Sequence, residues 1–476
     1  MRLFLTLAVT LWLPAVLAAP QPDLGDLDLL PLHATSPVAV AKAVEAAQRS
    51  KTPGPALFAV SVELPLGLDD GIWDAPEPGV ARWRTRVYSA EAQALIMSFG
   101  RFDLPAGAAL WVYDAQGRTL QGPYTGARGD EALWTAMVPG DTAVIELRVP
   151  GAQRLNTSLA LSRVGHAFKN AAQLGDSGAC NIDTACALGS GWRDESRAVV
   201  KLQIPAGLFV GLCTGTLVNN TAEDGTPYVL TADHCGIGTL GSPASGVVVY
   251  WNFQNSSCGG APDAISNQTQ SGARLRADDR ETDLTLIELD ERPSAAFNAY
   301  YAGWDASGRG GNQGVGIHHP SGDAKKISEF TVPLQAANVQ IEVAGPSIPA
   351  WRVDRWQQGT TEQGSSGSGL WNESRHIVGI LSGGSAACNG NVDNDQPDFY
   401  ARLDRQWEAG TAASGQLKAW LDPIDSGALQ ISGRNAGGGG GSTAGGGTGG
   451  GGGGGGAFGW GSLLFGGLLL MARRRR

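Results

Sequence analysis

The sequence predicts a protein built almost entirely of β-strands. Short apolar or alternating runs bounded by Gly, Pro and Asp recur along the chain, whereas few segments show the 3.6-residue period of a helix. One exception is 415–421, where Leu417, Trp420 and Leu421 fit one face of a helix that ends before Pro423. The runs expected to form strands are 109–113, 132–138, 142–149, 198–204, 215–218, 228–231, 246–251, 284–289 and 377–381.

Length and cysteine positions predict two domains. The chain has 476 residues, which exceeds the size at which single cores stop growing, about 250 to 300 residues. Residues 19–169 contain no cysteine, and we expect them to form a β-sandwich-like unit that is either a binding module or a removable pro-region. All six cysteines lie within 170–434, which we expect to form the second domain.

The N-terminus predicts export. Residues 1–18 follow the charged, apolar and small-residue order of a secretory signal peptide, with the cut placed after Ala18. This apolar run is shorter than the roughly 20 residues that a membrane-spanning helix needs. We therefore expect a secreted protein.

The C-terminus predicts a sorting tail. Residues 435–456 are almost pure glycine and should form a flexible linker. The apolar run in 457–476, which ends in four arginines, would rise only about 24 Å as a helix, less than the roughly 30 Å of a bilayer core. This end resembles the glycine-rich C-terminal signals of exported bacterial proteins that an intramembrane protease cuts. We expect contact with the export and sorting machinery, and transient membrane or cell-surface attachment through the tail alone.

The charge of the chain excludes one class of function. A net charge of -10 and a pI of about 5.2 oppose nucleic-acid binding, which uses a basic face. The basic run is confined to 473–476. We expect a monomer that binds proteins or peptides and no nucleic acid.

Six cysteines in an exported chain predict three disulfides. They are Cys180, Cys186, Cys213, Cys235, Cys258 and Cys388. Six cysteines allow fifteen pairings, which spacing alone does not resolve. A CxxC pair, the usual mark of a cysteine metal site, is absent from the sequence, so we expect no metal and no cofactor.

Three separated motifs together predict a nucleophilic site. His234 follows a strand-like run and precedes Cys235, Asp283 heads the alternating run 284–289, and Ser366 lies between Gly364 and Gly367. Each alone has an ordinary explanation, because lone histidines are mostly structural, acids often cap strands and Gly/Ser clusters form turns. Together they supply a nucleophile, a base and an orienting carboxylate.

The order His, Asp, Ser in these settings resembles the chymotrypsin-fold serine peptidases, and more closely the bacterial lysyl endopeptidases. The likeness covers roughly residues 178–430. It is carried by residues 180–183, 217–221, 249–252, 302–305, 317–320 and 420–423. The resemblance implies two six-stranded β-barrels with the site in the cleft between them.

The resemblance also assigns roles. It implies Ser366 as nucleophile, His234 as general base, Asp283 as orienting carboxylate, and the backbone N–H groups of Gly364 and Ser366 as the oxyanion hole. It further implies three disulfide pairs, Cys180 with Cys388, Cys186 with Cys258, and Cys213 with Cys235.

Substrate selection is expected to depend on Asp398. The position that carries the acid in trypsin-type enzymes is Thr360 here, whereas lysyl endopeptidases use an aspartate after the last cysteine, which Asp398 matches. The wall for the substrate backbone is expected at Ser382, Gly383 and Gly384, with Ser382 where the family carries a histidine. The alternative is a solvated or calcium-binding loop of Asp393, Asp395 and Asp398.

The resulting hypothesis is a secreted serine endopeptidase that cuts after lysine and is made as an inactive precursor. Of the seven lysines, Lys169 falls between the two domains, so we expect self-cleavage there with Asn170 as the new N-terminus. The competing hypotheses are a catalytically dead adhesin or binding module, and a peptidase of broader Lys/Arg or of glutamate specificity. An acid at position 398 opposes glutamate specificity, because like charges repel.

Overall fold

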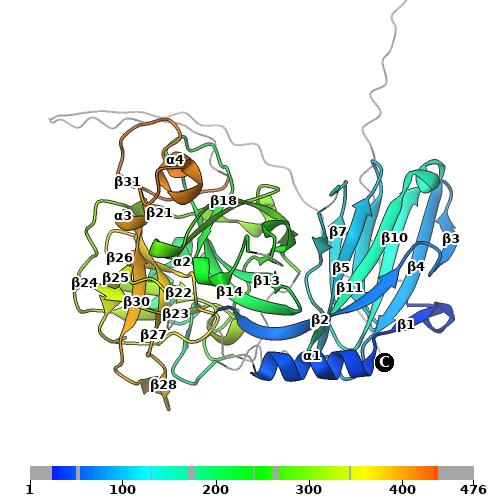
Figure 1. Ribbon diagram of the computed structural model, residues 1–476, viewed down its shortest axis with the longest axis horizontal. Helices are drawn as coiled ribbons and strands as arrows, with labels where there is room; N and C mark the ends of the chain where they lie inside the picture. Colours follow the sequence, from blue (N-terminus) through cyan, green and yellow to red (C-terminus); the bar gives the residue numbers. More distant parts are fainter. Residues whose placement is uncertain are drawn as a thin grey trace, which may run out of the picture. The chain divides into compact units, whose positions relative to one another are not determined.

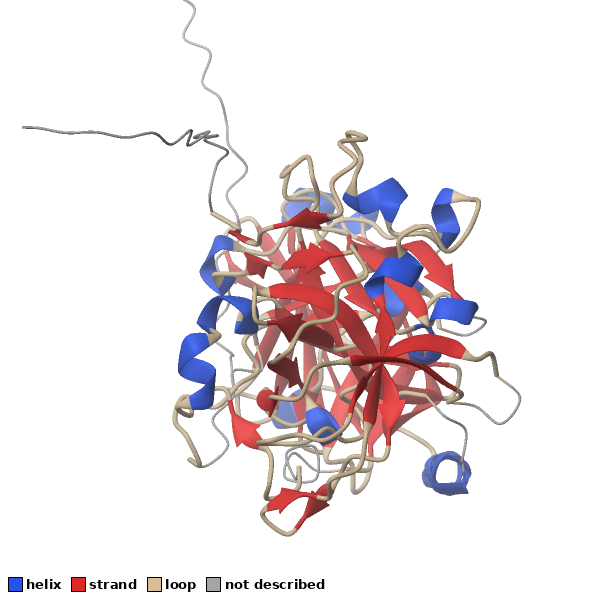
Figure 2. Cartoon of the chain, turned by 90° about the vertical axis from the view of Figure 1, so that its left-hand side faces the viewer, coloured by secondary structure: helices blue, strands red, loops and turns tan. Residues whose placement is uncertain are grey.

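β-strands make up most of the regular structure of this computed structural model, which describes residues 24–49, 54–129, 131–169, 177–239, 242–260, 267–341 and 345–437. Figure 2 shows short helices around a mass of strands. The prediction of an all-β fold is therefore confirmed. The chain divides into two compact units, Met1–Gly438 and Gly439–Arg476, and the second lies outside the described residues.

The N-terminal region forms two sheets around one apolar core. Its elements are η1 (Leu27–Leu29), β1 (Leu32–Ala34), α1 (Pro37–Arg49), β2 (Ala56–Leu66), β3 (Ile72–Glu77), β4 (Val80–Tyr88), β5 (Ala94–Asp103), β6 (Ala109–Asp114), β7 (Leu120–Tyr124), β8 (Leu133–Trp134), β9 (Val138–Pro139), β10 (Thr142–Pro150), η2 (Gly151–Asn156) and β11 (Ser158–Ala167).

One of these sheets has the order β1-β4-β10-β6-β7, and the other contains β2, β11, β5 and β8. Every second residue of β10 (Ala143, Ile145, Leu147 and Val149) enters the shared core, as the period of two in a half-buried strand requires. The blue and cyan strands of Figure 1 show this group. Helix α1 has no counterpart in the sequence-based expectation.

The second region is again mainly strands. Its elements are β12 (Ile182–Asp183), η3 (Leu188–Gly191), α2 (Arg193–Ser196), β13 (Val199–Ala206), β14 (Phe209–Val218), β15 (Tyr228–Thr231), η4 (Asp233–Cys235), η5 (Ala244–Gly246), β16 (Val248–Tyr250), β17 (Thr269–Ser271), β18 (Ala273–Asp279), η6 (Arg280–Thr282), β19 (Leu284–Leu289), η7 (Ala295–Phe297), β20 (Tyr300–Tyr301), β21 (Gly303–Asp305), β22 (Gly314–His318), η8 (Pro320–Gly322), β23 (Lys326–Phe330), β24 (Gln335–Val339), β25 (Ile348–Val353), β26 (Gly369–Asn372), β27 (His376–Gly384), β28 (Cys388–Asn389), β29 (Val392–Asp393), β30 (Asp398–Arg402), α3 (Leu403–Gln406), η9 (Ala413–Gly415), α4 (Lys418–Leu421), β31 (Gln430–Ile431) and β32 (Arg434–Asn435).

These strands form two six-stranded groups. The first runs β16-β13-β14-β15-β19-β18 and the second β23-β22-β26-β27-β30-β25. Among the described residues, no pairing joins the two end strands of either group, so hydrogen bonds do not close the barrels. One continuous apolar core nevertheless includes side chains of both groups, among them Leu230, Leu286 and Ile380. The expected helix at 415–421 is only the single turn α4, with Leu417 and Leu421 fully buried.

Strand β2 joins the two regions. It pairs with β11 of its own region and antiparallel with β14 of the second, where Ala56 lies opposite Leu212 and Val60 opposite Phe209. An apolar cluster continues across this pairing and contains Phe58 and Trp134 together with Val248. The described part of Met1–Gly438 is thus held together by both backbone pairing and apolar burial.

Three disulfides close the second region. They join Cys180 to Cys388, Cys186 to Cys258, and Cys213 to Cys235, which are the pairs that the resemblance implies. No cysteine is left free. The pair Cys180–Cys388 spans 208 residues and so links the segment just before β12 to β28.

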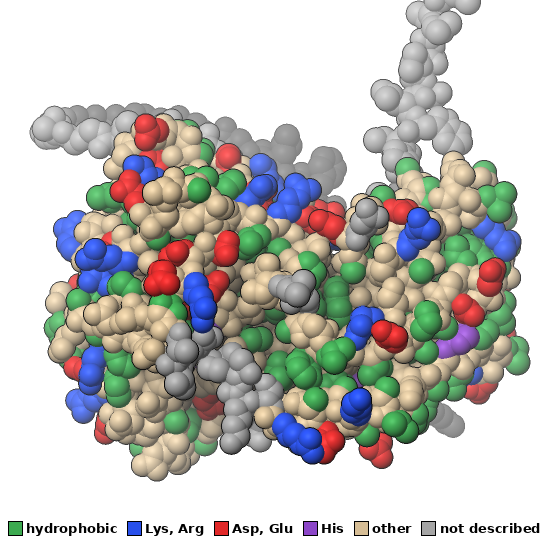
Figure 3. All heavy atoms as spheres, in the orientation of Figure 1, with side chains coloured by type: hydrophobic (Ala, Val, Ile, Leu, Met, Phe, Trp, Pro, Cys, Tyr) green, Lys and Arg blue, Asp and Glu red, His purple; other side chains and the backbone are tan. Residues whose placement is uncertain are grey.

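The surface carries both signs of charge. In Figure 3, Lys and Arg side chains are interspersed with Asp and Glu over the visible face of the described residues, without a broad basic area. Within the described ranges, no helix combines the length and the apolar character that crossing a bilayer requires. The predicted signal peptide 1–18, the linker 435–456 beyond residue 437 and the tail 457–476 lie outside the described residues.

Candidate active site

Two neighbouring strands bring His234 and Asp283 together. Strands β15 and β19 pair antiparallel with Thr231 opposite Thr285, so the end of one lies beside the start of the other. His234 follows in η4, and Asp283 precedes β19 with a φ of 52°, a left-handed conformation that Asp tolerates better than most residues.

The Asp283 carboxylate binds the histidine at two points. Both of its oxygens lie 3.0 Å from His234 Nδ1, and Oδ1 also accepts the backbone N–H of His234 at 3.0 Å. The side chain of Asp283 is almost completely buried. A carboxylate only accepts hydrogen bonds, so it selects the tautomer with the proton on Nδ1 and leaves the Nε2 lone pair for another donor.

The disulfide Cys213–Cys235 fixes the loop that carries His234. It connects β14 to η4, the turn that contains the histidine. On the other side, Ser366 O accepts the backbone N–H of Thr214, also from β14, at 2.9 Å. The loops of His234 and Ser366 are therefore both attached to the same strand.

The loop of Ser366 requires glycine on both sides. Gly364 has a φ of 97° and Gly367 a φ of 80°, the region in which glycine alone is unstrained. A Cβ atom at Gly367 would lie 2.1 Å from Thr231 Oγ1 and 2.6 Å from Thr214 O, while one at Gly364 would lie 3.0 Å from His319 O. The backbone can thus turn sharply here and approach its neighbours closely.

Two backbone N–H groups of this loop remain available. Among the described residues, neither Gly364 N nor Ser366 N donates to a protein acceptor, whereas Gly367 N donates to Leu381 O at 2.9 Å. Unpaired donors on either side of a small turn suit an external oxygen.

His234 and Ser366 line one hollow of about 390 Å³. The expected wall residues Ser382, Gly383 and Gly384, at the end of β27, line it as well. So does Gly54, which precedes β2 of the N-terminal region. The structure therefore brings the base, the serine and the expected substrate wall to one place.

Asp398 lies directly behind this wall. It starts β30 opposite Gly384 of β27, and only 1% of it is exposed. A Cβ atom at Gly384 would lie 2.0 Å from Asp398 Oδ1, so a side chain at position 384 would separate the carboxylate from the hollow. The absence of a side chain at Gly384 leaves this approach free of a Cβ atom, while Asp398 itself does not line the hollow.

The carboxyl of Asp398 is held from the opposite side. Its Oδ2 accepts hydrogen bonds from Trp356 Nε1 and Thr361 Oγ1, each at 2.7 Å. Burial raises the pKa of Asp398 to about 6, although these two hydrogen bonds act in the opposite direction. The sequence did not indicate Trp356 or Thr361 as partners, because both lie far from Asp398 along the chain.

Thr360 is not part of the hollow. Its side chain is fully buried, and its hydroxyl donates to Asp393 Oδ1 at 2.8 Å. The alternative calcium loop gains no support either. Within the described residues, no group of three or more His, Cys, Asp or Glu side chains is placed to hold a metal ion.

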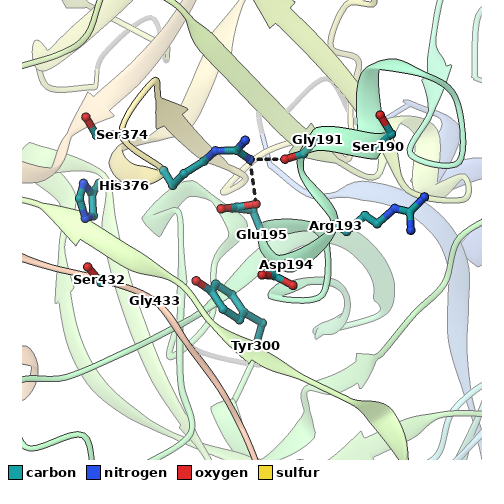
Figure 4. Close-up of a pocket in the computed structure, with 11 residues that line it drawn as sticks. Ser190, Gly191, Arg193, Asp194, Glu195, Tyr300, Ser374, His376, Ser432 and Gly433 are labelled. Atoms are coloured by element: carbon teal, nitrogen blue, oxygen red, sulfur yellow. Dashed lines mark hydrogen bonds and ion pairs between the residues drawn. The ribbon is translucent and has the colours of Figure 1, made fainter. Parts of the chain in front are cut away.

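A second hollow of about 570 Å³ lies elsewhere, between α2, β20 and the start of β27 (Figure 4). The ion pair between Arg375 and Glu195 crosses it at 3.3 Å, and the guanidinium carbon of Arg375 also lies 3.9 Å from the centre of the Trp192 ring. Arg375 and Glu195 thus already bind one another. The hollow beside Ser366 is therefore the better candidate for chemistry.

A strand-built pair of six-stranded groups, with a His–Asp pair and a glycine-flanked serine at one hollow, is the arrangement of trypsin-like serine peptidases. Residues 174–401 match the family model described as lysyl endopeptidase, C-terminal domain. This part of the chain is thus similar to that family.

A known protein shows the same similarity. Lysyl endopeptidase of Pseudomonas aeruginosa is 30% identical over 316 residues, which cover 62% of this chain and 64% of that protein. The chain thus spans slightly less than two thirds of that relative's length.

Solved structures with low overall similarity are also proteases. The active form of the Rv3671c protease from M. tuberculosis has a TM-score of 0.34 and 18% identity, covering 50% of this chain and 87% of that one. The MamO protease domain from Magnetospirillum magneticum has a TM-score of 0.31 and 14% identity, covering 46% and 100%. These scores are too low to support any statement about the site.

Proposed function

We propose that the protein is a serine endopeptidase that hydrolyses peptide bonds after lysine. The observation that carries this proposal is the common hollow of His234 and Ser366, with Asp283 bound to the far side of the imidazole. In this proposal, His234 Nε2 takes the proton of Ser366 Oγ as the hydroxyl attacks the scissile carbonyl. Asp283 stabilises the imidazolium that forms, and His234 then protonates the leaving amine.

The free N–H groups of Gly364 and Ser366 would bind the oxyanion of the tetrahedral intermediate. Donors of this kind stabilise the transition state by about 3 kcal/mol each, because they are fixed before the reaction begins. Their lack of protein acceptors among the described residues supports this role.

Asp398 would select lysine. Its carboxylate lies behind Gly384 at the wall of the hollow, and within the described ranges the side chains that donate hydrogen bonds to it are the neutral ones of Trp356 and Thr361. A substrate ammonium group supplies the missing positive charge, and removing either partner from such a buried pair typically costs about 3 to 5 kcal/mol. Arginine carries the same charge on a longer, planar group, so this contact alone does not distinguish the two.

The proposed activity is tested by digesting a denatured protein mixture and identifying the cleaved bonds by mass spectrometry. We expect cuts after lysine. Ser366→Ala should lower the rate by about a million-fold, because the nucleophile is lost. Ser374→Ala, a serine of the second hollow, is the matched control and should leave the rate unchanged. Equal cutting after Lys and Arg would refute strict lysine specificity, and activity of Ser366→Ala would refute the mechanism.

The chain would be made as a precursor whose N-terminal region covers the site. Gly54 lines the same hollow as Ser366, and the ring of Pro55 packs where a Cβ atom of Gly211 in β14 would be, 2.6 Å away. Strand β2 continues from there along β14. An extended segment in this position would keep a substrate from pairing with the same strand edge.

In this proposal, the loop of Ser366 takes its shape before cleavage. Glu362, four residues before Ser366, accepts the backbone N–H of Gly178 at 2.7 Å and the Asn181 amide at 2.8 Å. Gly178 donates as an ordinary peptide amide, so the loop needs no newly formed amino terminus. In this proposal the precursor is therefore inactive because its N-terminal region obstructs the site, and not because the site is unformed.

Cleavage is proposed after Lys169, which is half-buried just beyond the end of β11. The new terminus, Asn170, lies outside the described residues. Export to an oxidising compartment is supported by the three disulfides. Sorting through the C-terminal tail and a monomeric state remain part of the proposal.

A further inference from the structure

A continuous line of hydrogen bonds lies behind the nucleophile loop, on the side away from the hollow. His318 ends β22 and is completely buried. Its Nδ1 lies 2.8 Å from the hydroxyl of Ser365, the residue before Ser366, and its Nε2 lies 3.0 Å from the hydroxyl of Ser328 in β23. The imidazole thus bridges the nucleophile loop and a core strand.

The direction of every bond in this line follows from its ends. The Ser328 hydroxyl donates to Thr360 O at 2.6 Å, and a carbonyl can only accept. Ser328 has one proton, so its oxygen must accept the Nε2–H of His318. A neutral imidazole carries a single N–H proton, which here lies on Nε2. Nδ1 therefore accepts a hydrogen bond from the Ser365 hydroxyl.

The other end of the line is also fixed. The Ser365 oxygen accepts the backbone N–H of Glu362 at 3.2 Å, while Ser365 N donates to Glu362 O at 3.0 Å. The line therefore runs from Glu362 through Ser365, His318 and Ser328 to Thr360. It starts and ends on the segment that leads into Gly364 and Ser366.

We propose that His318 is a positioning residue that holds the oxyanion N–H groups and Ser366 in their reactive arrangement through Ser365. This inference rests on the proposed peptidase function. Ser365 stands between the two N–H donors, so fixing its hydroxyl fixes the orientation of the peptide groups on both sides. Small displacements of such donors reduce catalysis strongly.

The surroundings keep the imidazole in the form that this line requires. Complete burial, with a smaller contribution from the charge of Lys326, lowers the pKa of His318 to about 3. A protonated ring would carry a proton on Nδ1 and could no longer accept from Ser365. A neutral imidazole both donates and accepts along one axis, which an apolar side chain of the same size cannot do.

The test compares three substitutions by steady-state kinetics on a lysyl peptide amide and by active-site titration. His318→Phe keeps the ring volume and loses both hydrogen bonds. Ser328→Ala breaks the line at its remote end without contacting the hollow. His318→Gln retains a donor and an acceptor. Ser196→Ala is the matched control, because this buried hydroxyl has no hydrogen-bond partner among the described residues.

We expect kcat to fall about tenfold to a hundredfold in His318→Phe and more modestly in Ser328→Ala, with a smaller change in KM. His318→Gln should recover part of the loss, and Ser196→Ala should match the wild type. Thermal unfolding identifies the folded fraction. If His318→Phe does not fold, the kcat of folded Ser328→Ala tests the positioning role by itself.

Three results have different meanings. Folded Ser328→Ala and His318→Phe with wild-type kcat would overturn the positioning role while leaving the peptidase function intact. A wild-type enzyme without activity on lysyl bonds would instead overturn the proposed function. A loss of thermal stability with unchanged kcat would show that the line only supports the fold.

Discussion

At the scale of single residues, one part of the candidate site could be predicted from the sequence, whereas the other part could be described only from the fold. His234, Asp283 and Ser366 lie in short motifs whose residue types suggest their chemistry directly. The environment of Asp398 could not be read in this way. Trp356 and Thr361 approach its carboxyl from distant segments, and the opening at Gly384 depends on the register between β27 and β30.

The raised pKa of Asp398 predicts how cation binding depends on pH. Its pKa is raised to about 6, mainly by burial, so the carboxyl is charged above that value and neutral below it. We expect the affinity for butylammonium, a competitor that imitates the lysine side chain, to be constant above about pH 7. Below pH 6 it should fall nearly tenfold per unit, because each proton bound removes the negative partner.

Inhibition constants measured from pH 4.5 to 8 check this prediction. Asp398→Asn should bind butylammonium weakly at every pH, since the amide carries no charge. Asp395→Asn is the control, because Asp395 is exposed and its carboxylate lies near Arg355 instead. A pH-independent inhibition constant in the wild type would show that Asp398 does not bind the cation.

At the scale of elements, the positions of most strands could be predicted from the sequence, whereas the pairing between strands could not. The runs 228–231 and 284–289 correspond to β15 and β19 within a residue. Helix α1 could not be predicted in the same way, because its alanine-rich run has no broad apolar stripe and buries only Val40 and Ala47. The pairing of β2 with β14 was also not predictable, since partners about 150 residues apart leave no local signal.

The pairing of β2 with β14 predicts how latency can be lost. In full-length Lys169→Ala, which should remain uncleaved, we expect weak hydrolysis of a small lysyl amide. Adding Ala56→Glu should raise it at least about tenfold, because a buried charge opposite Leu212 disrupts the shared apolar cluster. Both substitutions lie in the N-terminal region, so the sequence of the second region is unchanged in this variant.

Ala41→Glu makes the same chemical change at an exposed position of α1 and should leave the precursor latent. Gel electrophoresis must show that each chain is intact during the assay. If Lys169→Ala alone is as active as the cleaved enzyme, the N-terminal region does not obstruct the site. If it still matures with a start other than Asn170, the proposed cleavage position is wrong.

At the scale of the whole molecule, the disulfides and the N-terminal region hold the second region in complementary ways. Cys180–Cys388 closes a span of 208 residues and constrains the unfolded chain most, whereas Cys213–Cys235 closes 22 residues beside His234. The cluster around Phe58 and Val248 buries apolar surface that the second region would expose alone. The number of cysteines predicted the number of disulfides, and only the family resemblance supplied their pairing.

The most direct test of the central claim is covalent labelling of the active protein with a phosphonate that carries a lysine side chain, followed by peptide mass mapping. We predict one adduct per molecule, located on Ser366, because His234 activates that hydroxyl and Asp398 holds the reagent's ammonium group. Ser366→Ala should acquire no label. An adduct on another residue, or an unlabelled chain that still cleaves lysyl bonds, would contradict the assignment of Ser366 as the nucleophile.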